Sequence, residues 1–198
     1  MTENTVLLQD ETSEKYFRFS TRRITALFIE TIVQHLKKND PKIILDAGCG
    51  TGFITDIINR SMDVTIVSCD MNAHRISCAK TQFHLETVIA DITHLPFRSS
   101  SFDTVLAIEI IEHLPDKESA LDEIKRVTRK NVIITVPFDP YFMIANFLRG
   151  KNVRSFGNPP DHVNHFNKKT LKAFLSRFHL KGEISRNAFL WLTADVNK

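Results

Sequence analysis

Short apolar runs alternate with segments of helical periodicity through the middle of this chain. Residues 43–47, Ile-Ile-Leu-Asp-Ala, form an apolar run bounded by turn residues, which is typical of a buried parallel strand. Residues 53–60 carry apolar side chains at a helical spacing. The alternation continues with strands predicted at 64–69, 86–90, 102–108 and 131–136, and helices at 72–82 and 117–128. It predicts an α/β fold, with helices on both faces of a doubly wound, mostly parallel sheet.

Segments on both sides of this alternation are also predicted to be structured. Apolar residues before the first strand keep a helical spacing, so we expect an N-terminal helical segment within residues 1–38. Downstream, Asn167 has the character of a helix N-cap, and two final strands are predicted at about 180–186 and 188–195. We expect residues 1–198 to form a single domain.

Residues 138–167 interrupt the alternation after the fifth predicted strand. This segment mixes aromatic and apolar residues with glycine, proline and basic side chains, and it contains the apolar stretch 141–148. It follows a strand at the carboxyl edge of the sheet, where α/β proteins bind ligands. We therefore expect a substrate-side insert that acts as a lid. Contact of the stretch 141–148 with a membrane surface is the alternative.

Composition and charge narrow the class of protein. The 198 residues suffice for one α/β domain, and 42% hydrophobic with 25% charged residues is ordinary for a globular protein. The net charge of +3 is too small to argue for nucleic acid. The sequence shows neither a secretory leader pattern nor an apolar run of the roughly 18–20 residues that span a bilayer. Three cysteines without C-x-x-C spacing agree with a reducing compartment, so we expect a cytoplasmic protein.

The first predicted strand runs into a glycine-rich turn with an acid at its start, Asp46-Ala-Gly-Cys-Gly-Thr-Gly52. Glycines let the backbone turn tightly and approach a ligand closely. A dinucleotide-binding loop would need another glycine where Phe53 stands, and a phosphate-binding P-loop would need Gly-Lys-Ser/Thr, which is absent. The carboxylate of Asp46 would repel a pyrophosphate but suits an ammonium group. The pattern favours a nucleoside ligand with a cationic amino acid end.

This turn resembles the first motif of the class I S-adenosylmethionine-dependent methyltransferases. Further motifs of that family follow in order: a second strand that ends in Asp70, a third that ends in Asp91, and a fourth that runs from Ser101 to Glu109. The resemblance covers about residues 40–137. It implies a seven-stranded, Rossmann-like sheet with an antiparallel edge, and it implies S-adenosyl-L-methionine as the cofactor.

The resemblance also assigns roles at the ends of these strands. Asp46 and the glycine loop would hold the methionine portion of the cofactor, and Asp70 its ribose hydroxyls. Met71 would pack on adenine, and Asp91 with Ile92 would frame the amino edge of the ring. The full set of expected cofactor contacts is Asp46, Gly48, Cys49, Gly50, Gly52, Asp70, Met71, Asp91, Ile92 and Ile108. Turn formation is the alternative explanation for acids at strand ends.

Methyl transfer from a sulfonium leaves a neutral thioether, so an enzyme mainly supplies proximity and orientation. A base is needed only if the acceptor arrives protonated. Three histidines are candidates for that role: His113 after the fourth strand, and His162 and His165 in the insert. Packing or loop capping is the alternative for each. No metal site is predicted, because the H-x-x-H pair in the insert has no nearby cysteine or second pair.

The sequence therefore predicts a methyltransferase that acts on a small molecule, apolar with an anionic or polar group. Two alternatives stay open. An RNA or protein methyltransferase is favoured by basic residues, which outnumber acids between 138 and 170. A non-catalytic S-adenosylmethionine-binding protein is disfavoured by the intact acids at the ends of the first three strands.

Overall fold

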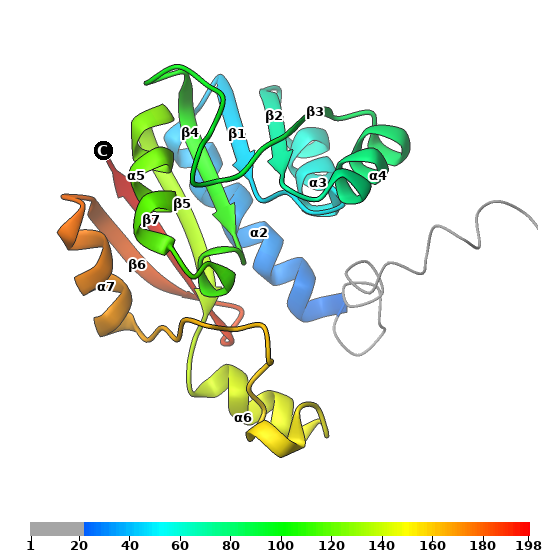
Figure 1. The fold of residues 1–198 in the computed structure, drawn as a ribbon, viewed down its shortest axis with the longest axis vertical. Helices are drawn as coiled ribbons and strands as arrows, with labels where there is room; N and C mark the ends of the chain where they lie inside the picture. Colours follow the sequence, from blue (N-terminus) through cyan, green and yellow to red (C-terminus); the bar gives the residue numbers. More distant parts are fainter. Residues whose placement is uncertain (1–21) are drawn as a thin grey trace, which may run out of the picture.

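A seven-stranded sheet runs through the centre of the computed structural model, which describes residues 22–198 (Figure 1). Its strands are β1 (Ile43–Ala47), β2 (Thr65–Asp70), β3 (Glu86–Ile89), β4 (Phe102–Ile108), β5 (Thr128–Pro137), β6 (Lys181–Asn187) and β7 (Trp191–Asn197). They lie in the order β3-β2-β1-β4-β5-β7-β6. The first five are parallel, whereas β7 runs antiparallel to both β5 and β6. The doubly wound, mostly parallel sheet with an antiparallel edge is confirmed.

Helices cover both faces of this sheet (Figure 1). They are α2 (Arg22–Asn39), α3 (Phe53–Ser61), α4 (Ala73–Phe83), α5 (Lys117–Val127), α6 (Tyr141–Leu148) and α7 (Lys168–Arg177), with short 3-10 turns η2 (Ile111–His113) and η3 (Val153–Ser155). On one face, Phe28 of α2 packs in a core with Ile44 of β1. On the other, Leu121 of α5 and Leu171 of α7 share a core with Leu45. Successive strand residues point to opposite faces, so strands covered on both sides are almost continuously apolar.

Polar side chains cap three helices that begin at the carboxyl edge of the sheet. Asn72 caps α4, Asp116 caps α5, and Asn167 forms a capping box with Thr170 at the start of α7. The N-cap predicted at Asn167 is confirmed. These caps satisfy backbone N–H groups that the helices leave without partners, and so they fix where the loops around the edge begin.

A few boundaries differ from the sequence-based expectation. β5 begins at Thr128 rather than at 131, because the chain passes directly from α5 into the sheet, where Thr128 pairs with Phe102 of β4. The insert contains α6, where only a lid or loop was expected. Residues 1–21 of the expected N-terminal segment lie outside the described residues. Among the described helices, none is both long enough and apolar enough to cross a bilayer.

Candidate active site

The acids singled out in the sequence lie at one edge of the sheet. Asp46 is close to the end of β1, and Asp70 ends β2, where it pairs with Ile89 at the end of β3. The carboxyl ends of parallel strands face the crevice in which α/β folds bind ligands. β4 ends at the same edge and leads into η2, and Figure 1 shows α6 beyond the end of β5.

Backbone hydrogen bonds hold the turn between β1 and α3 against the end of β2. The N–H groups of Gly48 and Cys49 both donate to the carbonyl of Cys69, over 2.8 and 2.9 Å. Gly48 has a φ of +86°, and a Cβ there would lie 2.8 Å from the side chain of Ile110. At Gly50, by contrast, no described atom beyond its chain neighbours lies within 4 Å of the position a Cβ would take. The turn is closed at Gly48 and open to a ligand at Gly50.

Asp46 is a buried carboxyl group with one oxygen in use. The residue is 2% exposed, and its Oδ2 accepts a hydrogen bond from the hydroxyl of Thr55. Among the described residues, no donor reaches its Oδ1. Burial raises the pKa of Asp46 to about 6; the Thr55 hydrogen bond opposes this rise, and the nearby Asp70 charge adds to it. A buried carboxyl with an unused oxygen suits a cationic group of a ligand.

Asp70 fixes the shape of the edge through both of its oxygens. Oδ2 accepts the N–H of Gly50 over 3.0 Å, and Oδ1 accepts the N–H of Asn72 over 2.8 Å. Each carboxylate oxygen has two lone pairs, so each keeps capacity for a further donor such as a ribose hydroxyl. The residue is 6% exposed, so this capacity lies within the edge rather than on open surface.

Comparison with known proteins agrees with this geometry. Residues 45–136 match the family described as "Methyltransferase domain". The O-methyltransferase rstn1 of Aspergillus nomiae is 33% identical over 127 residues, which cover 61% of this chain and 55% of that protein. Norajmaline N-methyltransferase of Rauvolfia serpentina is 29% identical over 161 residues, covering 77% and 51%. The chain thus spans about half the length of these curated relatives.

Solved structures share the whole fold. A SAM dependent methyltransferase from Aquifex aeolicus gives a TM-score of 0.72 at 17% identity, over 95% of this chain and 98% of that one. Magnesium protoporphyrin IX methyltransferase (ChlM) from Synechocystis, solved with bound SAH, gives 0.71 at 11% identity, over 99% and 100%. Together, the family match over residues 45–136, the curated relatives and the shared fold support a class I S-adenosylmethionine-dependent methyltransferase. The cofactor of that family is S-adenosyl-L-methionine.

The residues at the edge fit S-adenosyl-L-methionine. The unused Oδ1 of Asp46 would be available to the ammonium group, and Asp70 retains acceptor capacity for hydroxyl groups. The open side of Gly50 leaves room for the cofactor to approach the backbone. Burial, with the charges of Asp46 and Asp70, raises the pKa of the Cys49 thiol, which therefore stays protonated. The thiol therefore adds no negative charge beside Asp46.

The other expected cofactor contacts of this methyltransferase domain fall into two groups. Met71 is 74% exposed on the turn after β2, where its apolar side chain is available to a ring. Asp91 holds its own turn, because Oδ1 accepts hydrogen bonds from the N–H and the hydroxyl of Thr93, and these bonds lower the pKa of Asp91. Ile92 and Ile108 are each 8% exposed and pack into the two cores. Their contact with a cofactor stays a prediction.

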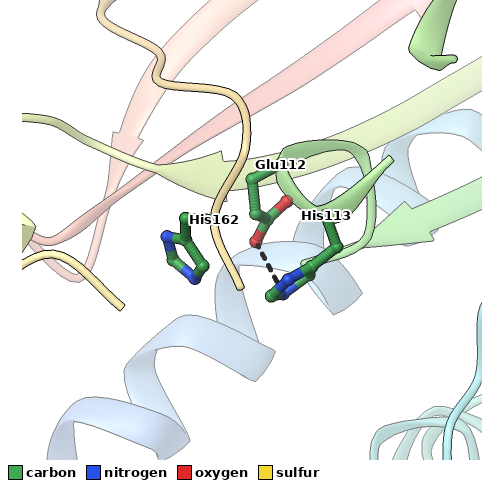
Figure 2. Close-up of side chains that lie close together, drawn as sticks. All are labelled: Glu112, His113 and His162. Carbon is green, nitrogen blue, oxygen red and sulfur yellow. Dashed lines mark ion pairs between the residues drawn. The ribbon is translucent and has the colours of Figure 1, made fainter. Parts of the chain in front are cut away.

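The fold brings two of the three candidate histidines together. His113 in η2 and His162 in the insert meet edge to face, with ring centroids 4.8 Å apart, and Glu112 lies beside them (Figure 2). His165 is not part of this group: its Nδ1 lies 2.9 Å from Oδ2 of Asp139. Burial raises the pKa of Asp139, and the contact with His165 works against that rise.

Hydrogen bonds clamp the insert onto η2. The N–H groups of Val163 and Asn164 both donate to the carbonyl of Glu112, over 2.9 and 3.0 Å. The side-chain amide of Asn164 donates to the carbonyls of Ile111 and Leu114, over 3.1 and 2.7 Å. The insert is therefore fixed to the exit of β4 immediately after its first histidine.

Three residues of this region were not identified from the sequence. Thr55 donates to Asp46 from the first turn of α3, a contact that a hydroxyl one helical turn after the glycine loop could have suggested. Glu112 precedes His113, and no pattern in the sequence marked it as a candidate site residue. Trp191 of β7 donates from Nε1 to Oε2 of Glu109 over 2.7 Å, at the exit of β4. Only the pairing of β7 with β5 brings that indole to the edge.

Proposed function

We propose that this chain transfers the methyl group of S-adenosyl-L-methionine to a small-molecule acceptor. The observation that carries the proposal is the buried carboxyl of Asp46, whose Oδ1 has no donor among the described residues, beside the open backbone of Gly50. This pair fits the cationic amino acid end of the cofactor. Cys49, Cys69 and Cys78 are free thiols, in agreement with the cytoplasmic location that forms part of the proposal.

The insert supports a small-molecule acceptor. Beyond the end of β5, it leaves large apolar side chains exposed, namely Tyr141, Ile144, Phe147, Leu148 and Phe156. A surface of this kind can close over an apolar molecule and exclude water from it. The relatives described as O-methyltransferase and as norajmaline N-methyltransferase point the same way.

In the proposed reaction, the chain mainly positions the two reactants. The acceptor forms a bond to the methyl carbon, and the carbon–sulfur bond breaks with its electron pair moving to sulfur, which leaves as a neutral thioether. Asp46 and Asp70 orient the cofactor. A protonated acceptor must also lose a proton, and His113, His162 and His165 are the candidate groups for this step.

Methyl transfer to RNA is a second candidate, because basic side chains gather in the insert. Arg149, Lys151 and Arg154 are exposed there beside the apolar side chains. Phosphate contacts from arginine and lysine supply most of the non-specific affinity for nucleic acid. The net charge of +3 for the whole chain gives this candidate less support.

A transfer assay with methyl-tritiated cofactor tests the proposal. The protein is incubated with fractionated cell extract, and label is counted separately in small molecules, RNA and protein. We expect label in the small-molecule fraction, and much less of it at low cofactor concentration when Asp70→Ala replaces the wild type. Label in RNA or protein instead would support a macromolecular acceptor. Cofactor binding without transfer to any fraction would identify a non-catalytic binding protein.

A further inference from the structure

We propose that Glu112, His113 and His162 bind one divalent transition-metal ion. One ligand atom from each side chain, two imidazole nitrogens and a carboxylate oxygen, lies within 4.8 Å of the other two. Within residues 22–198, this is the one group of three such side chains that the fold brings so close. Figure 2 shows them converging from two segments, the turn after β4 and the insert.

The donor set indicates the class of ion. Two imidazoles and one carboxylate are ligands that suit Zn²⁺, Mn²⁺ and Fe²⁺, and three protein ligands leave positions open for another molecule. Metal–nitrogen bonds of about 2.0–2.1 Å place neighbouring ligand atoms of a tetrahedral site about 3.3 Å apart. His113 Nε2 lies 3.9 Å from Oε1 of Glu112. Small side-chain rotations therefore bring these two atoms to the spacing that an ion requires.

The ring of His113 is oriented as in a metal-binding histidine. Its Nδ1 lies 3.0 Å from the carbonyl oxygen and 3.3 Å from Oδ2 of Asp161. Donation from Nδ1 to either oxygen leaves Nε2 with its lone pair, on the side of the ring toward Glu112. Metal-binding histidines almost always have such an acceptor on the second nitrogen, which fixes the tautomer and the ring plane.

His162 is held in place from two directions. Its ring stacks on Phe142 of α6, with centroids 5.7 Å apart and planes at 20°. The residues that follow it, Val163 and Asn164, are hydrogen-bonded to the carbonyl of Glu112. The carboxylate of Glu112 is 1% exposed, forms an ion pair with His113 and lies beside both imidazoles, so a buried carboxylate and two imidazole nitrogens face one another.

The cluster adjoins the glycine loop that fits the methionine end of the cofactor. Ile110, directly before η2, is the residue against which Gly48 packs. An open coordination position of an ion held by Glu112, His113 and His162 would therefore take an oxygen of the acceptor, close to the methyl group to be transferred. This assignment of a role rests on the proposed function, whereas the metal site itself does not.

Titration of the purified protein with MnCl₂ or ZnCl₂ alone, followed by calorimetry, tests the site without substrate. We expect one ion per chain. Glu112→Gln, His113→Gln and His162→Gln should each weaken binding by about a hundredfold or more, since loss of an outer partner alone typically costs 10–100-fold. His165→Gln is the matched control. His165 lies in the same loop as His162 but pairs with Asp139, so the metal affinity of this variant should equal that of the wild type.

A second measurement needs no variant. Because a metal ion competes with protons for a histidine nitrogen, metal affinity of the wild type should fall as the pH is lowered. The absence of stoichiometric binding to the wild type would overturn the site. Binding that stays the same in all three ligand variants, each shown to be folded by its thermal transition, would overturn it too.

Measurements on the same samples separate this inference from the proposed function. Normal cofactor affinity and methyl transfer without any metal binding would overturn the metal site alone. Metal binding without transfer to any acceptor would overturn the proposed function alone. If both hold, a chelator should abolish transfer and added Mn²⁺ or Zn²⁺ should restore it; transfer that is insensitive to the chelator would overturn the role assigned to the ion.

Discussion

Gly50 donates its backbone N–H to Oδ2 of Asp70 over 3.0 Å, which ties the turn after β1 to the acid that ends β2. The other oxygen of the same carboxylate accepts the N–H of Asn72, the cap of α4. One side chain therefore shapes the glycine loop and fixes the start of the next helix. Removing it must affect both the ligand contacts and the loop that carries them.

Asp70→Ala should weaken cofactor binding by about thirtyfold or more, because hydrogen bonds from two ribose hydroxyls to a carboxylate, worth roughly 2–3 kcal/mol, are lost. It should also lower the thermal midpoint, since the N–H groups of Gly50 and Asn72 lose their acceptor. Calorimetry and thermal unfolding measure the two effects. Asp63→Ala, an exposed acid just before the opposite end of β2, should change neither. An unchanged affinity in folded Asp70→Ala would remove the assignment of the ribose site.

Cofactor affinity should rise as the pH increases from about 5 to about 7. The pKa of Asp46 is about 6, so below that pH the carboxyl is neutral and offers the ammonium group no opposite charge. Because the bound cofactor favours the ionised form, binding below pH 6 should release a proton from Asp46. Calorimetry in buffers of different ionisation enthalpy detects both the affinity change and the proton.

Two variants show whether Asp46 is the titrating group. Asp46→Asn should bind weakly at every pH and lose the pH dependence. Thr55→Val removes the hydroxyl whose hydrogen bond lowers the pKa of Asp46, so the midpoint of the affinity profile should move to higher pH. A flat profile in the wild type, or an unmoved midpoint in Thr55→Val, contradicts this prediction.

The same carboxyl should make the free energy of unfolding fall as pH rises from 3.8 to about 6. In this interval the folded chain holds the Asp46 proton while the unfolded chain has already lost it, so ionisation opposes folding until about pH 6, above which the contribution is constant. A rise of the Asp46 pKa from 3.8 to about 6 corresponds to roughly 3 kcal/mol of unfolding free energy. Carboxyls with a lowered pKa, such as Asp103 and Glu123, act in the opposite direction. The readout is therefore the difference between wild type and Asp46→Asn in urea unfolding, which should decline across the interval and then level off.

The sequence was sufficient for the sheet because β1, β4 and β5 are buried on both faces, and such strands leave apolar runs between turn residues. It was also sufficient to place Asp46 and Asp70 at the carboxyl edge of the sheet, since each stands at or near the end of a predicted strand and Asp46 precedes the glycine loop. The helix α6 was not predicted, because an eight-residue apolar run has no polar face from which a helical period can be read.

Contacts between distant segments could not be predicted in the same way. The meeting of His113 with His162, and of Glu109 with Trp191, depends on where the insert and β7 return to the sheet. Nothing in the local sequence around any of these four residues records its partner. The expectation that the chain has no metal site was based on ligand spacing within one segment. It could not take account of ligands that come from two distant segments.

Within the insert, the loop that follows α6 packs back against this helix at Gly157, and this contact provides a test of the lid. Gly157 has a φ of +85°, its carbonyl accepts from the side chain of Asn146, and a Cβ would collide with the carbonyl oxygen of Met143. Gly157→Ala should lower kcat/KM for the acceptor found in the tritium assay by about tenfold or more while leaving cofactor affinity unchanged. Gly150→Ala is the matched control, with a φ of +69° but open space around the added Cβ. Equal effects of both substitutions would assign the loss to backbone strain instead.

Limited proteolysis tests closure of the insert directly. Trypsin should cut at Lys151 and Arg154, which are exposed in the segment between α6 and Gly157, and cutting should slow when cofactor and acceptor are both bound, because a closed lid withdraws this segment from solvent. Cleavage at Arg98, exposed between β3 and β4, serves as the internal control and should not change. Cleavage of the insert that ignores both ligands would reduce it to a packing element. Protection by anionic phospholipid vesicles alone would show instead that the apolar and basic side chains around α6 contact a membrane surface.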